Sequence, residues 1–230
     1  MAAIPLSQKV NDRAYMKIAR KMRPTVASIR RRALVATLHR WYDDAGFENV
    51  TGVEVGVKYG SLTKEICQWC PWIEKMICVD PWEEYPQDHR DRGQFGYAGR
   101  DQKSWNWVYK RANDILGPLI AEGRVEIQRT YSVQAASGLL AAGRQVHFAY
   151  LDARHAYDDV LEDCRAWWPV VMAGGLLCFD DYYGQPEESP LNWRRATTGV
   201  SDAADDFARE TGLPIFGLHR SAYIEKPMAS

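Results

Sequence analysis

Residues that can do chemistry follow the predicted buried strands of this chain. Gly56 ends the apolar run that begins at Val50, Asp80 ends the next such run, and Asp152 and Asp180 end two later ones. In open α/β sheets, ligands bind beyond the carboxyl ends of the strands. We therefore expect these positions to converge on one ligand site, with the capping of a following helix as the alternative role for each aspartate.

The segment from Val53 to Ser61, with the sequence VEVGVKYGS, is typical of a strand that runs into a glycine turn and then a helix. Gly56 and Gly60 can adopt positive φ and let a ligand approach the backbone, and Ser61 can cap the helix. The free N–H groups at such a helix start favour a carboxylate or a phosphate. The G-x-x-x-G spacing differs from the G-x-G-x-x-G dinucleotide fingerprint, so the turn alone identifies no cofactor.

Asp152, Asp180 and Asp181 offer the hard oxygen ligands that Mg²⁺ prefers. A metal ion there would lower the pKa of a bound substrate hydroxyl and hold its oxygen as a nucleophile. A base for the proton is still needed, and His155 lies three residues after Asp152 on the same loop. The alternative for His155 is a packing or helix-capping role, and His147, inside a predicted strand, is interpreted as a core residue.

Strands and helices alternate from residue 50 onwards, which predicts an α/β fold with a Rossmann-like, doubly wound sheet. Asp101 and Ser132 are predicted helix caps. A closing hairpin is expected at 214–218 and 222–224. The predicted strands are 50–56, 75–80, 125–127, 146–151 and 175–179, and the predicted helices are 61–69, 101–121, 133–142, 157–168 and 200–211.

Residues 7–44 show helical periodicity and are locally basic. Pro24 is expected to divide them into two helices, the second of which ends at Gly46. The basic side chains are typical of a solvated helical face, with an acidic-partner or dimer surface as the alternative. Glu83 to Gly99 is turn-rich, charged and aromatic, and is interpreted as an irregular insertion or lid. We expect a helical extension at 1–46 and the domain that carries the site at 47–230.

Composition and charge limit the class of protein. With 230 residues, 46% of them hydrophobic, the chain can bury the core of one large domain. A formal net charge of -1 argues against a protein that wraps nucleic acid. No apolar run reaches the roughly 20 residues of a membrane span, and no signal-peptide core is seen, so we expect a cytoplasmic protein. The five cysteines, including the Cys67-x-x-Cys70 pair, are interpreted as reduced thiols.

The chain resembles the class I S-adenosylmethionine-dependent methyltransferases, and within them the metal-dependent small-molecule O-methyltransferases related to the macrocin and catechol enzymes. The resemblance covers roughly Val50 to the C-terminus. It rests on VEVGVKYGS at 53–61, VDPW at 79–82, LDARHAY at 151–157, the stretch from the glycine pair at 174–175 to FDDY at 179–182, and GVSDAADDF at 199–207.

This resemblance implies a seven-stranded, mostly parallel sheet with a C-terminal antiparallel hairpin, and S-adenosylmethionine lying across the first two strand ends. Asp80 would contact the ribose, and Trp82, Tyr131 and Ser132 the adenine. Glu54 would contact the methionine part. The full implied cofactor-binding set is Glu54, Gly56, Tyr59, Gly60, Ser61, Asp80, Trp82, Tyr131, Ser132 and Asp152.

The resemblance also implies a divalent metal, Mg²⁺ or another cation, held by Asp152, Asp180 and Asp181, with Asp152 and His155 as catalytic residues. The macrocin-like pattern tends to have an acid two positions after the first metal aspartate, where this chain has Arg154. Arg154 could instead bind an anionic acceptor. We expect an O-methyltransferase that positions the hydroxyl of a small molecule, such as a sugar, a phenol or a natural product, in line with the methyl donor.

Three alternatives stay open at this stage. A nicotinamide-dependent oxidoreductase could use the same strand, turn and helix with Asp80, although the glycine spacing argues against it. A non-catalytic binding or assembly module could keep the fold and use the basic N-terminal helices as its contact surface. The arginine-rich start alone supports a nucleic-acid methyltransferase. A homodimer through the N-terminal helices is a further expectation.

Overall fold

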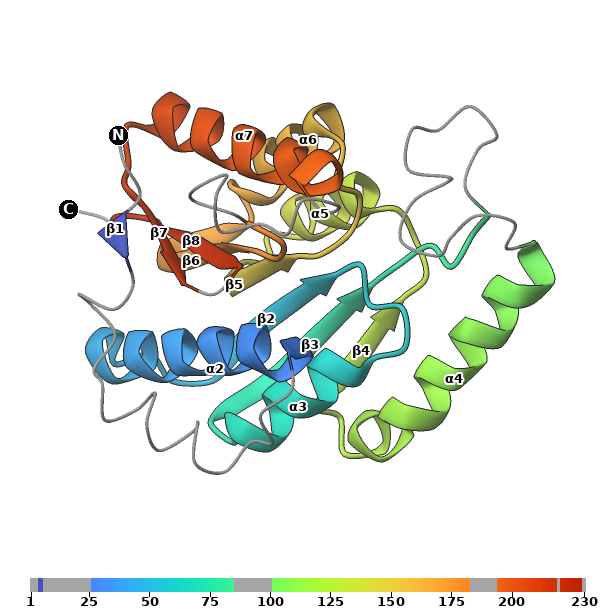
Figure 1. Ribbon diagram of the computed structural model, residues 1–230. Coiled ribbons are helices and arrows are strands. Elements are labelled where there is room, and N and C mark those ends of the chain that lie inside the picture. Colours follow the sequence, from blue (N-terminus) through green and yellow to red (C-terminus); the bar gives the residue numbers. More distant parts are fainter. Residues whose placement is uncertain (1–3, 6–25, 85–100, 183–193, 219, 229–230) are drawn as a thin grey trace.

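The structure is a computed structural model that describes residues 4–5, 26–84, 101–182, 194–218 and 220–228 (Figure 1). Its strands are β1 Ile4–Pro5, β2 Val50–Val55, β3 Ile73–Val79, β4 Val125–Gln128, β5 Val146–Leu151, β6 Val171–Phe179, β7 Ile215–Leu218 and β8 Ser221–Glu225. Its helices are α2 Val26–Ala45, α3 Ser61–Trp69, α4 Gln102–Ala121, α5 Ser132–Ala141, α6 Tyr157–Trp167 and α7 Arg194–Thr211.

The strands form one sheet in the order β1-β7-β8-β6-β5-β2-β3-β4. β8 runs antiparallel to both of its neighbours, and the other neighbouring strands are parallel. From β2 the chain builds outwards to β4, returns to β5 and then builds the other way. β2 and β5 therefore lie side by side where the winding direction changes, which is where open α/β sheets bind ligands.

This topology confirms the predicted doubly wound, mostly parallel sheet with an antiparallel strand near the C-terminus. The predicted helix 61–69 and strand 146–151 agree with α3 and β5 residue for residue. The edge strand β1 was not predicted, because two paired residues are too few to give a hydrophobic pattern. The division at Pro24 and most of the predicted insertion at 83–99 lie outside the described residues.

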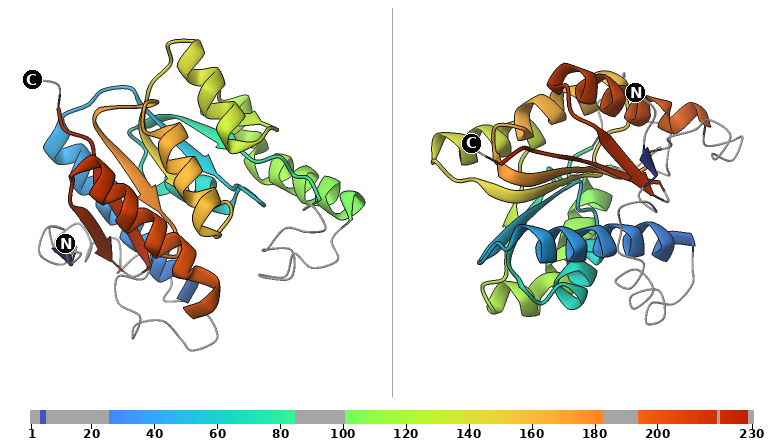
Figure 2. Two further views of the ribbon diagram at one scale, coloured as in Figure 1. Left: turned by 90° about the horizontal axis from the view of Figure 1, so that it is seen from above. Right: turned by 90° about the vertical axis from the view of Figure 1, so that its left-hand side faces the viewer.

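Helices cover both faces of the sheet, with α2, α3 and α4 on one side and α5, α6 and α7 on the other (Figures 1 and 2). A cluster of buried apolar side chains fills the space between the sheet and each layer of helices. Successive strand residues point to opposite faces, so Val53 and Val55 join the cluster under α5 to α7 while Val50 joins the other. This two-sided burial explains why the central strands are continuous apolar runs.

Helix α2 is part of this core. The Trp41 indole N–H donates to the carbonyl oxygen of Gly174 at 2.8 Å, and its ring meets Phe148 edge-on at 6.3 Å between centroids. Gly52 pairs with Phe148 on the adjacent strand, and a Cβ there would lie 2.1 Å from that ring. Glycine therefore makes the space that Phe148 fills beneath α2. The domain boundary at residue 46 and a dimer through the N-terminal helices stay predictions.

The helix ends test the predicted caps. Gly46 has a φ of 66° and bonds back into α2 at 3.2 Å, and the Asp101 side chain accepts the Ser104 N–H at 2.8 Å, so both predictions are confirmed. Ser61 and Ser132 are the first residues of α3 and α5 rather than their caps, so these two predictions are wrong. The cap positions are held by Gly60, in the left-handed conformation, and by Tyr131, in an extended one.

Two features of composition have structural counterparts. Among the described residues, no helix is both long enough and apolar enough to cross a bilayer. All five cysteines are buried and unpaired, in agreement with the predicted free thiols. Burial raises the pKa of Cys67 to about 11, which keeps this thiol protonated at neutral pH.

Candidate active site

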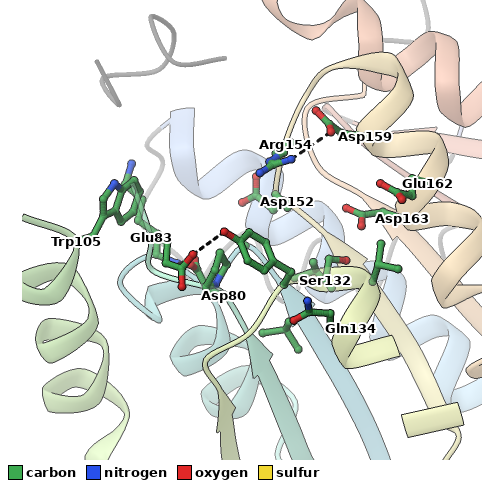
Figure 3. A pocket seen from close by; sticks show the side chains of 18 of the residues that line it. Asp80, Glu83, Trp105, Ser132, Gln134, Asp152, Arg154, Asp159, Glu162 and Asp163 are labelled. Carbon is green, nitrogen blue, oxygen red and sulfur yellow. Dashed lines mark hydrogen bonds and ion pairs between the residues drawn. The ribbon is translucent and has the colours of Figure 1, made fainter. Parts of the chain in front are cut away.

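A cavity of about 360 Å³ lies at the carboxyl ends of the strands, around the junction of β2 and β5 (Figure 3). Its volume is within the range of small-molecule sites. The predicted residues that line it are Gly56, Asp80, Tyr131, Ser132 and Asp152. Further polar lining residues include Lys58, Glu83, Glu84, Gln134, Arg154, Asp159, Glu162 and Asp163.

Gly56 lets the β2 and β5 ends meet at the bottom of this cavity. Its φ is 91°, and a Cβ there would lie 2.1 Å from the backbone oxygen of Asp152. The two strand ends are joined by a hydrogen bond of 2.8 Å from the Asp152 N–H to the Val55 oxygen. A side chain at position 56 would force these backbones apart, so glycine is required for the shape of the cavity.

The second glycine of the turn has a different task. Gly60 has a φ of 73°, and a Cβ there would lie 2.7 Å from the Leu116 side chain on α4. Gly60, Tyr59 and Ser61 do not line the cavity. Tyr59 instead meets Trp107 edge-on at 6.3 Å between ring centroids. Gly60 and Tyr59 thus pack the turn on α4, and the predicted cofactor contacts of Gly60, Tyr59 and Ser61 stay predictions.

Glu54 does not line the cavity, and its predicted contact with the cofactor stays a prediction. Its side chain is 2% exposed, and one carboxylate oxygen accepts both the backbone N–H of Thr63, at 3.0 Å, and the Thr63 hydroxyl. Glu54 thus satisfies a free N–H in the first turn of α3 and ties that helix to β2. Burial raises the pKa of Glu54 to about 8, against the lowering effect of the Thr63 hydrogen bonds.

Asp80 lines the cavity and also holds the glycine turn. Its two carboxylate oxygens accept the backbone N–H of Lys58 at 2.9 Å and that of Trp82 at 2.7 Å. Burial raises the pKa of Asp80 to about 6, and these backbone hydrogen bonds oppose that rise. The predicted position of this acid at the ligand site is therefore supported by its place in the cavity wall.

Trp82 does not line the cavity, and its predicted contact with the adenine stays a prediction. Its side chain is fully buried, and its indole N–H donates to the Lys58 backbone oxygen at 2.8 Å. The ring packs against Tyr109 with 4.9 Å between centroids. Trp82 has a φ of 45°, an uncommon conformation for a large residue, which turns the ring beneath the turn and away from the cavity.

Tyr131 and Glu83 both line the cavity and are joined by a hydrogen bond. The Tyr131 hydroxyl donates to the Glu83 carboxylate at 2.5 Å, and this hydrogen bond raises the pKa of Tyr131. Tyr131 is 40% exposed, so its ring offers an accessible flat surface to a ligand. Glu83 had been assigned to the insertion, and its contact across the cavity could not be predicted from its turn-rich surroundings.

Asp163 is a buried acid in the cavity wall that the sequence interpretation did not single out. It is 7% exposed and forms a hydrogen bond with the Ser132 hydroxyl. Burial is the main cause that raises the pKa of Asp163 to about 7. The sequence did contain a signal for the burial of Asp163. This residue lies three positions after Val160 and four before Trp167, which is the spacing of the buried face of α6.

Asp152 and Arg154 lie in the loop that leads from β5 to α6, and both line the cavity. Asp152 is half-buried in the cavity wall. Arg154 also lines the cavity and pairs with Asp159 at 3.4 Å. An anionic acceptor at Arg154 would therefore have to compete with an existing carboxylate partner.

His155 does not line the large cavity, but it lines a small pocket together with Asp152 and Asp180. It is 8% exposed, and its Nε2 atom is 3.3 Å from an Asp181 carboxylate oxygen. The other Asp181 oxygen accepts from Arg220, in the turn between β7 and β8. Close packing of α7 fixes this loop, because a Cβ on Gly199 would lie 2.3 Å from the His155 backbone oxygen. The structure thus joins His155 to Asp181 but not to the cavity wall, and its role as the base stays a prediction.

The three predicted metal ligands have different side-chain partners, although Asp152 and Asp180 line one small pocket together with His155. Asp180 accepts the Tyr150 hydroxyl at 2.7 Å, Asp181 is paired with Arg220, and Asp152 faces the cavity. In the part of the chain that the structure describes, no group of three or more His, Cys, Asp or Glu side chains is arranged to hold a metal ion. As placed, the three aspartates do not fit a magnesium ion, and the magnesium requirement stays a prediction.

The fold and the cavity define a Rossmann-like α/β protein with a small-molecule site at its topological switch point. A family model described as a methyltransferase domain matches residues 53–182, which is more than half of the 230 residues. The protein belongs to this methyltransferase family and is a class I S-adenosylmethionine-dependent methyltransferase. No curated protein sequence matches the chain.

Solved methyltransferase structures share the fold. A proposed caffeoyl-CoA O-methyltransferase from Staphylococcus aureus has a TM-score of 0.59 at 12% identity, covering 94% of this chain and 99% of that one. A calicheamicin methyltransferase has a TM-score of 0.55 at 14% identity, covering 98% and 94%. An O-methyltransferase family protein from Burkholderia thailandensis has a TM-score of 0.52 at 13% identity; the match covers 87% of this chain and 59% of that one. At these identities the likeness concerns the fold.

The cavity has the chemistry that S-adenosylmethionine requires. Gly56 leaves its floor open, and Asp80 offers carboxylate oxygens, the acceptors that ribose hydroxyls need. The wall contains seven carboxylic acids and two basic side chains, Lys58 and Arg154. An excess of acids favours a ligand that carries a net positive charge, as this sulfonium cofactor does.

Proposed function

We propose that this methyltransferase transfers a methyl group to the hydroxyl oxygen of a small molecule, such as a sugar, a phenol or a natural product. The observation that carries the proposal is a single cavity whose wall joins Gly56 and Asp80 to Asp152. The first two residues lie where the resemblance puts the cofactor, and the third offers a carboxylate beside it. The names of the Burkholderia and Staphylococcus proteins support oxygen as the acceptor atom.

The residues of the chain have separate tasks in this proposal. When bound, S-adenosylmethionine supplies a sulfonium methyl group that is already electrophilic. Asp80 holds the ribose, and the Gly56 turn keeps the cavity floor clear. Asp152 accepts the proton of the acceptor hydroxyl, because it is the predicted catalytic residue that lines the cavity. His155 is paired with Asp181 outside the cavity and positions the loop after β5.

A magnesium requirement is a prediction that can be tested independently of the acceptor. Asp180 and Asp181 already have Tyr150 and Arg220 as partners, so no step of the proposal passes through a metal. Methyl transfer is therefore to be measured with excess EDTA and with added Mg²⁺. Turnover that is lost in EDTA and restored by Mg²⁺ would show that methyl transfer requires a bound cation.

The direct test is transfer of a labelled methyl group from S-adenosylmethionine to a panel of hydroxylated acceptors, with the product identified by mass spectrometry and NMR. Asp152→Asn is expected to reduce kcat by about 100-fold or more, as the loss of a general base does. Its affinity for S-adenosylhomocysteine should change by less than about 3-fold, because the carboxamide keeps the shape of the wall.

Asp158→Asn is the matched control, because Asp158 is exposed on the first turn of α6 and does not line the cavity. It is expected to keep the wild-type kcat. A product methylated on nitrogen, or full activity of Asp152→Asn, would contradict the proposal.

A further inference from the structure

Ser132 and Asp163 stand together on one side of the cavity, while Asp80 and Glu83 stand on the other (Figure 3). Ser132 begins α5 and Asp163 lies in the second turn of α6, so two helices that are far apart in sequence meet here. If Asp80 holds the ribose, the purine base of the cofactor extends from it along the wall. Ser132 and Asp163 are then candidates to meet that base.

A hydrogen-bond chain fixes how Asp163 is presented. The Trp167 indole N–H donates to the Ser132 hydroxyl oxygen at 2.9 Å. An indole nitrogen can only donate, so Ser132 accepts from Trp167 and has its own hydroxyl proton free for Asp163. The hydrogen bond between Ser132 and Asp163 therefore runs from the hydroxyl to the carboxylate. This direction leaves Asp163 as an acceptor toward the cavity.

Burying the carboxyl of Asp163 costs free energy of folding, so this residue is better explained by ligand binding than by a contribution to stability. The carboxyl is 7% exposed beside Asp159 and Glu162, which disfavour its ionised form, while Arg154 favours it. An apolar residue at this position would continue the buried face made by Val160 and Trp167. A buried acid is expensive unless its oxygens are used. The hydrogen bond from Ser132 uses part of the acceptor capacity of the Asp163 carboxylate. Asp163 lines the cavity, so the rest is available to a ligand there.

We propose that Asp163 determines the specificity for the purine base, accepting a hydrogen bond from the exocyclic amino group of adenine. This inference rests on the proposed use of the cavity by S-adenosylmethionine. A hypoxanthine base carries a carbonyl oxygen in place of the amino group. Two acceptors would then face each other at Asp163, and a site built to bind a donor rejects such an analogue strongly.

The test compares the binding of S-adenosylhomocysteine with that of its inosine counterpart, S-inosylhomocysteine, by titration calorimetry. The wild-type protein is expected to prefer the adenine compound by about 100-fold or more. Asp163→Asn keeps an oxygen for the Ser132 hydroxyl and presents an N–H₂ donor to the cavity. It is expected to reduce the preference to about 5-fold or less, mainly by improving the affinity for the inosine compound.

Glu162→Gln is the matched control, because Glu162 is the neighbouring acid on α6, lines the same cavity and is exposed. It removes the same charge and is expected to keep the wild-type preference. Ser132→Ala is a second variant, which leaves Asp163 in place without its hydroxyl partner. It is expected to reduce the preference for the adenine compound by about 10-fold. This variant tests the role of Asp163 if Asp163→Asn does not fold.

The outcomes separate this inference from the proposed function. If the wild-type protein binds S-adenosylhomocysteine and Asp163→Asn keeps the full adenine preference, Asp163 is not the residue that recognises the base, although the cofactor site stands. If Glu162→Gln loses the preference equally, the effect is one of charge alone and the inference fails. If the wild-type protein binds neither compound, the proposed cofactor site itself is wrong.

Discussion

The parallel strands end at one edge of the sheet, and the two halves of this edge use their carboxylates differently. On the side of β2 and β3, Asp80 lines the cavity, and its oxygens accept hydrogen bonds from the turn that forms the cavity floor. On the side of β6, Asp180 and Asp181 are buried against Tyr150 and Arg220 and do not line the large cavity. The half at β2 and β3 is open to a ligand and is called the open half. The half at β6 is closed by side chains of the same chain and is called the closed half.

The difference shows what a pattern of acids after strands can and cannot predict. The sequence places all these acids at one edge of the sheet, because parallel strands end together there. Their partners come from elsewhere in the fold. Arg220 reaches Asp181 from the turn between β7 and β8, which lies 39 residues later in the chain. Such a partner decides whether a carboxylate is available, and spacing along a strand cannot reveal it.

The largest effect is expected from Gly56→Ala, which tests the open half. The new Cβ would lie 2.1 Å from the Asp152 backbone oxygen, in addition to the strain of a φ of 91°. We expect a loss of more than about 3 kcal/mol in the free energy of unfolding, or no measurable binding of S-adenosylhomocysteine. Chemical denaturation and calorimetry measure the two quantities.

Gly143→Ala is the matched control for that variant. Gly143 also has positive φ, 65°, but a Cβ there would meet nothing within 4 Å. It should cost about 1 kcal/mol through backbone strain and leave binding intact. Equal losses in the two variants would show that the close approach of β2 and β5 is not what requires the glycine.

Glu54→Gln tests the buried carboxyl that joins β2 to α3 in the open half, through the pH dependence of stability. Burial raises the pKa of Glu54 from 4.5 to about 8, so folding favours its protonated form. That stabilisation is present below pH 4.5 and is lost as the pH rises to 8. We expect the free energy of unfolding of the wild-type protein to fall by about 3 kcal/mol from this group between pH 5 and 8.

The carboxamide can still accept both hydrogen bonds of Thr63, because they reach one oxygen of Glu54. The variant should therefore fold and show a smaller fall in stability over the same range. Asp80 and Asp163 also have raised pKa values, so some pH dependence is expected to persist. Identical slopes for the two proteins would contradict the buried, protonated state of Glu54.

A smaller effect is expected from Arg220→Met, which tests the closed half. It leaves the Asp181 carboxylate, 7% exposed, without its guanidinium partner. Because Arg220 itself is 23% exposed, we expect a loss of about 2 kcal/mol in the free energy of unfolding. Binding of S-adenosylhomocysteine should change by less than about 3-fold.

Arg209→Met is the control, since Arg209 pairs with Asp206 on the surface of α7 with 69% of its side chain exposed. Such a pair contributes less than about 1 kcal/mol. Adding Asp181→Asn to Arg220→Met should recover part of the lost stability, because the buried charge is then gone. If Arg220→Met costs no more than Arg209→Met, the closed half does not depend on this pair.

The fold was predictable because hydrophobic runs and turns in this chain repeat in the order that a doubly wound sheet requires. α3 and β5 were located to the residue, since Gly60 and the acid Asp152 mark their ends. The position of the cavity was predictable, since Gly56, Asp80 and Asp152 all line it. Which side chains face the cavity depends on tertiary packing.

Trp82 and Glu54 illustrate that limit. Both lie in motifs that resemble a cofactor site, and both turn beneath the glycine turn, where Trp82 bonds to Lys58 and Glu54 to Thr63. Asp163 is the opposite case, an acid within an apolar helix face that packing brings to the cavity. Long-range contacts of this kind are not encoded in local spacing.

The most direct test of this account is a crystal structure of the protein with S-adenosylhomocysteine. The account predicts density for the compound in the cavity of about 360 Å³, with its ribose at Asp80 and its purine beside Ser132. Density in a second cavity, about 280 Å³ between α2 and β8, with none at Asp80, would contradict it.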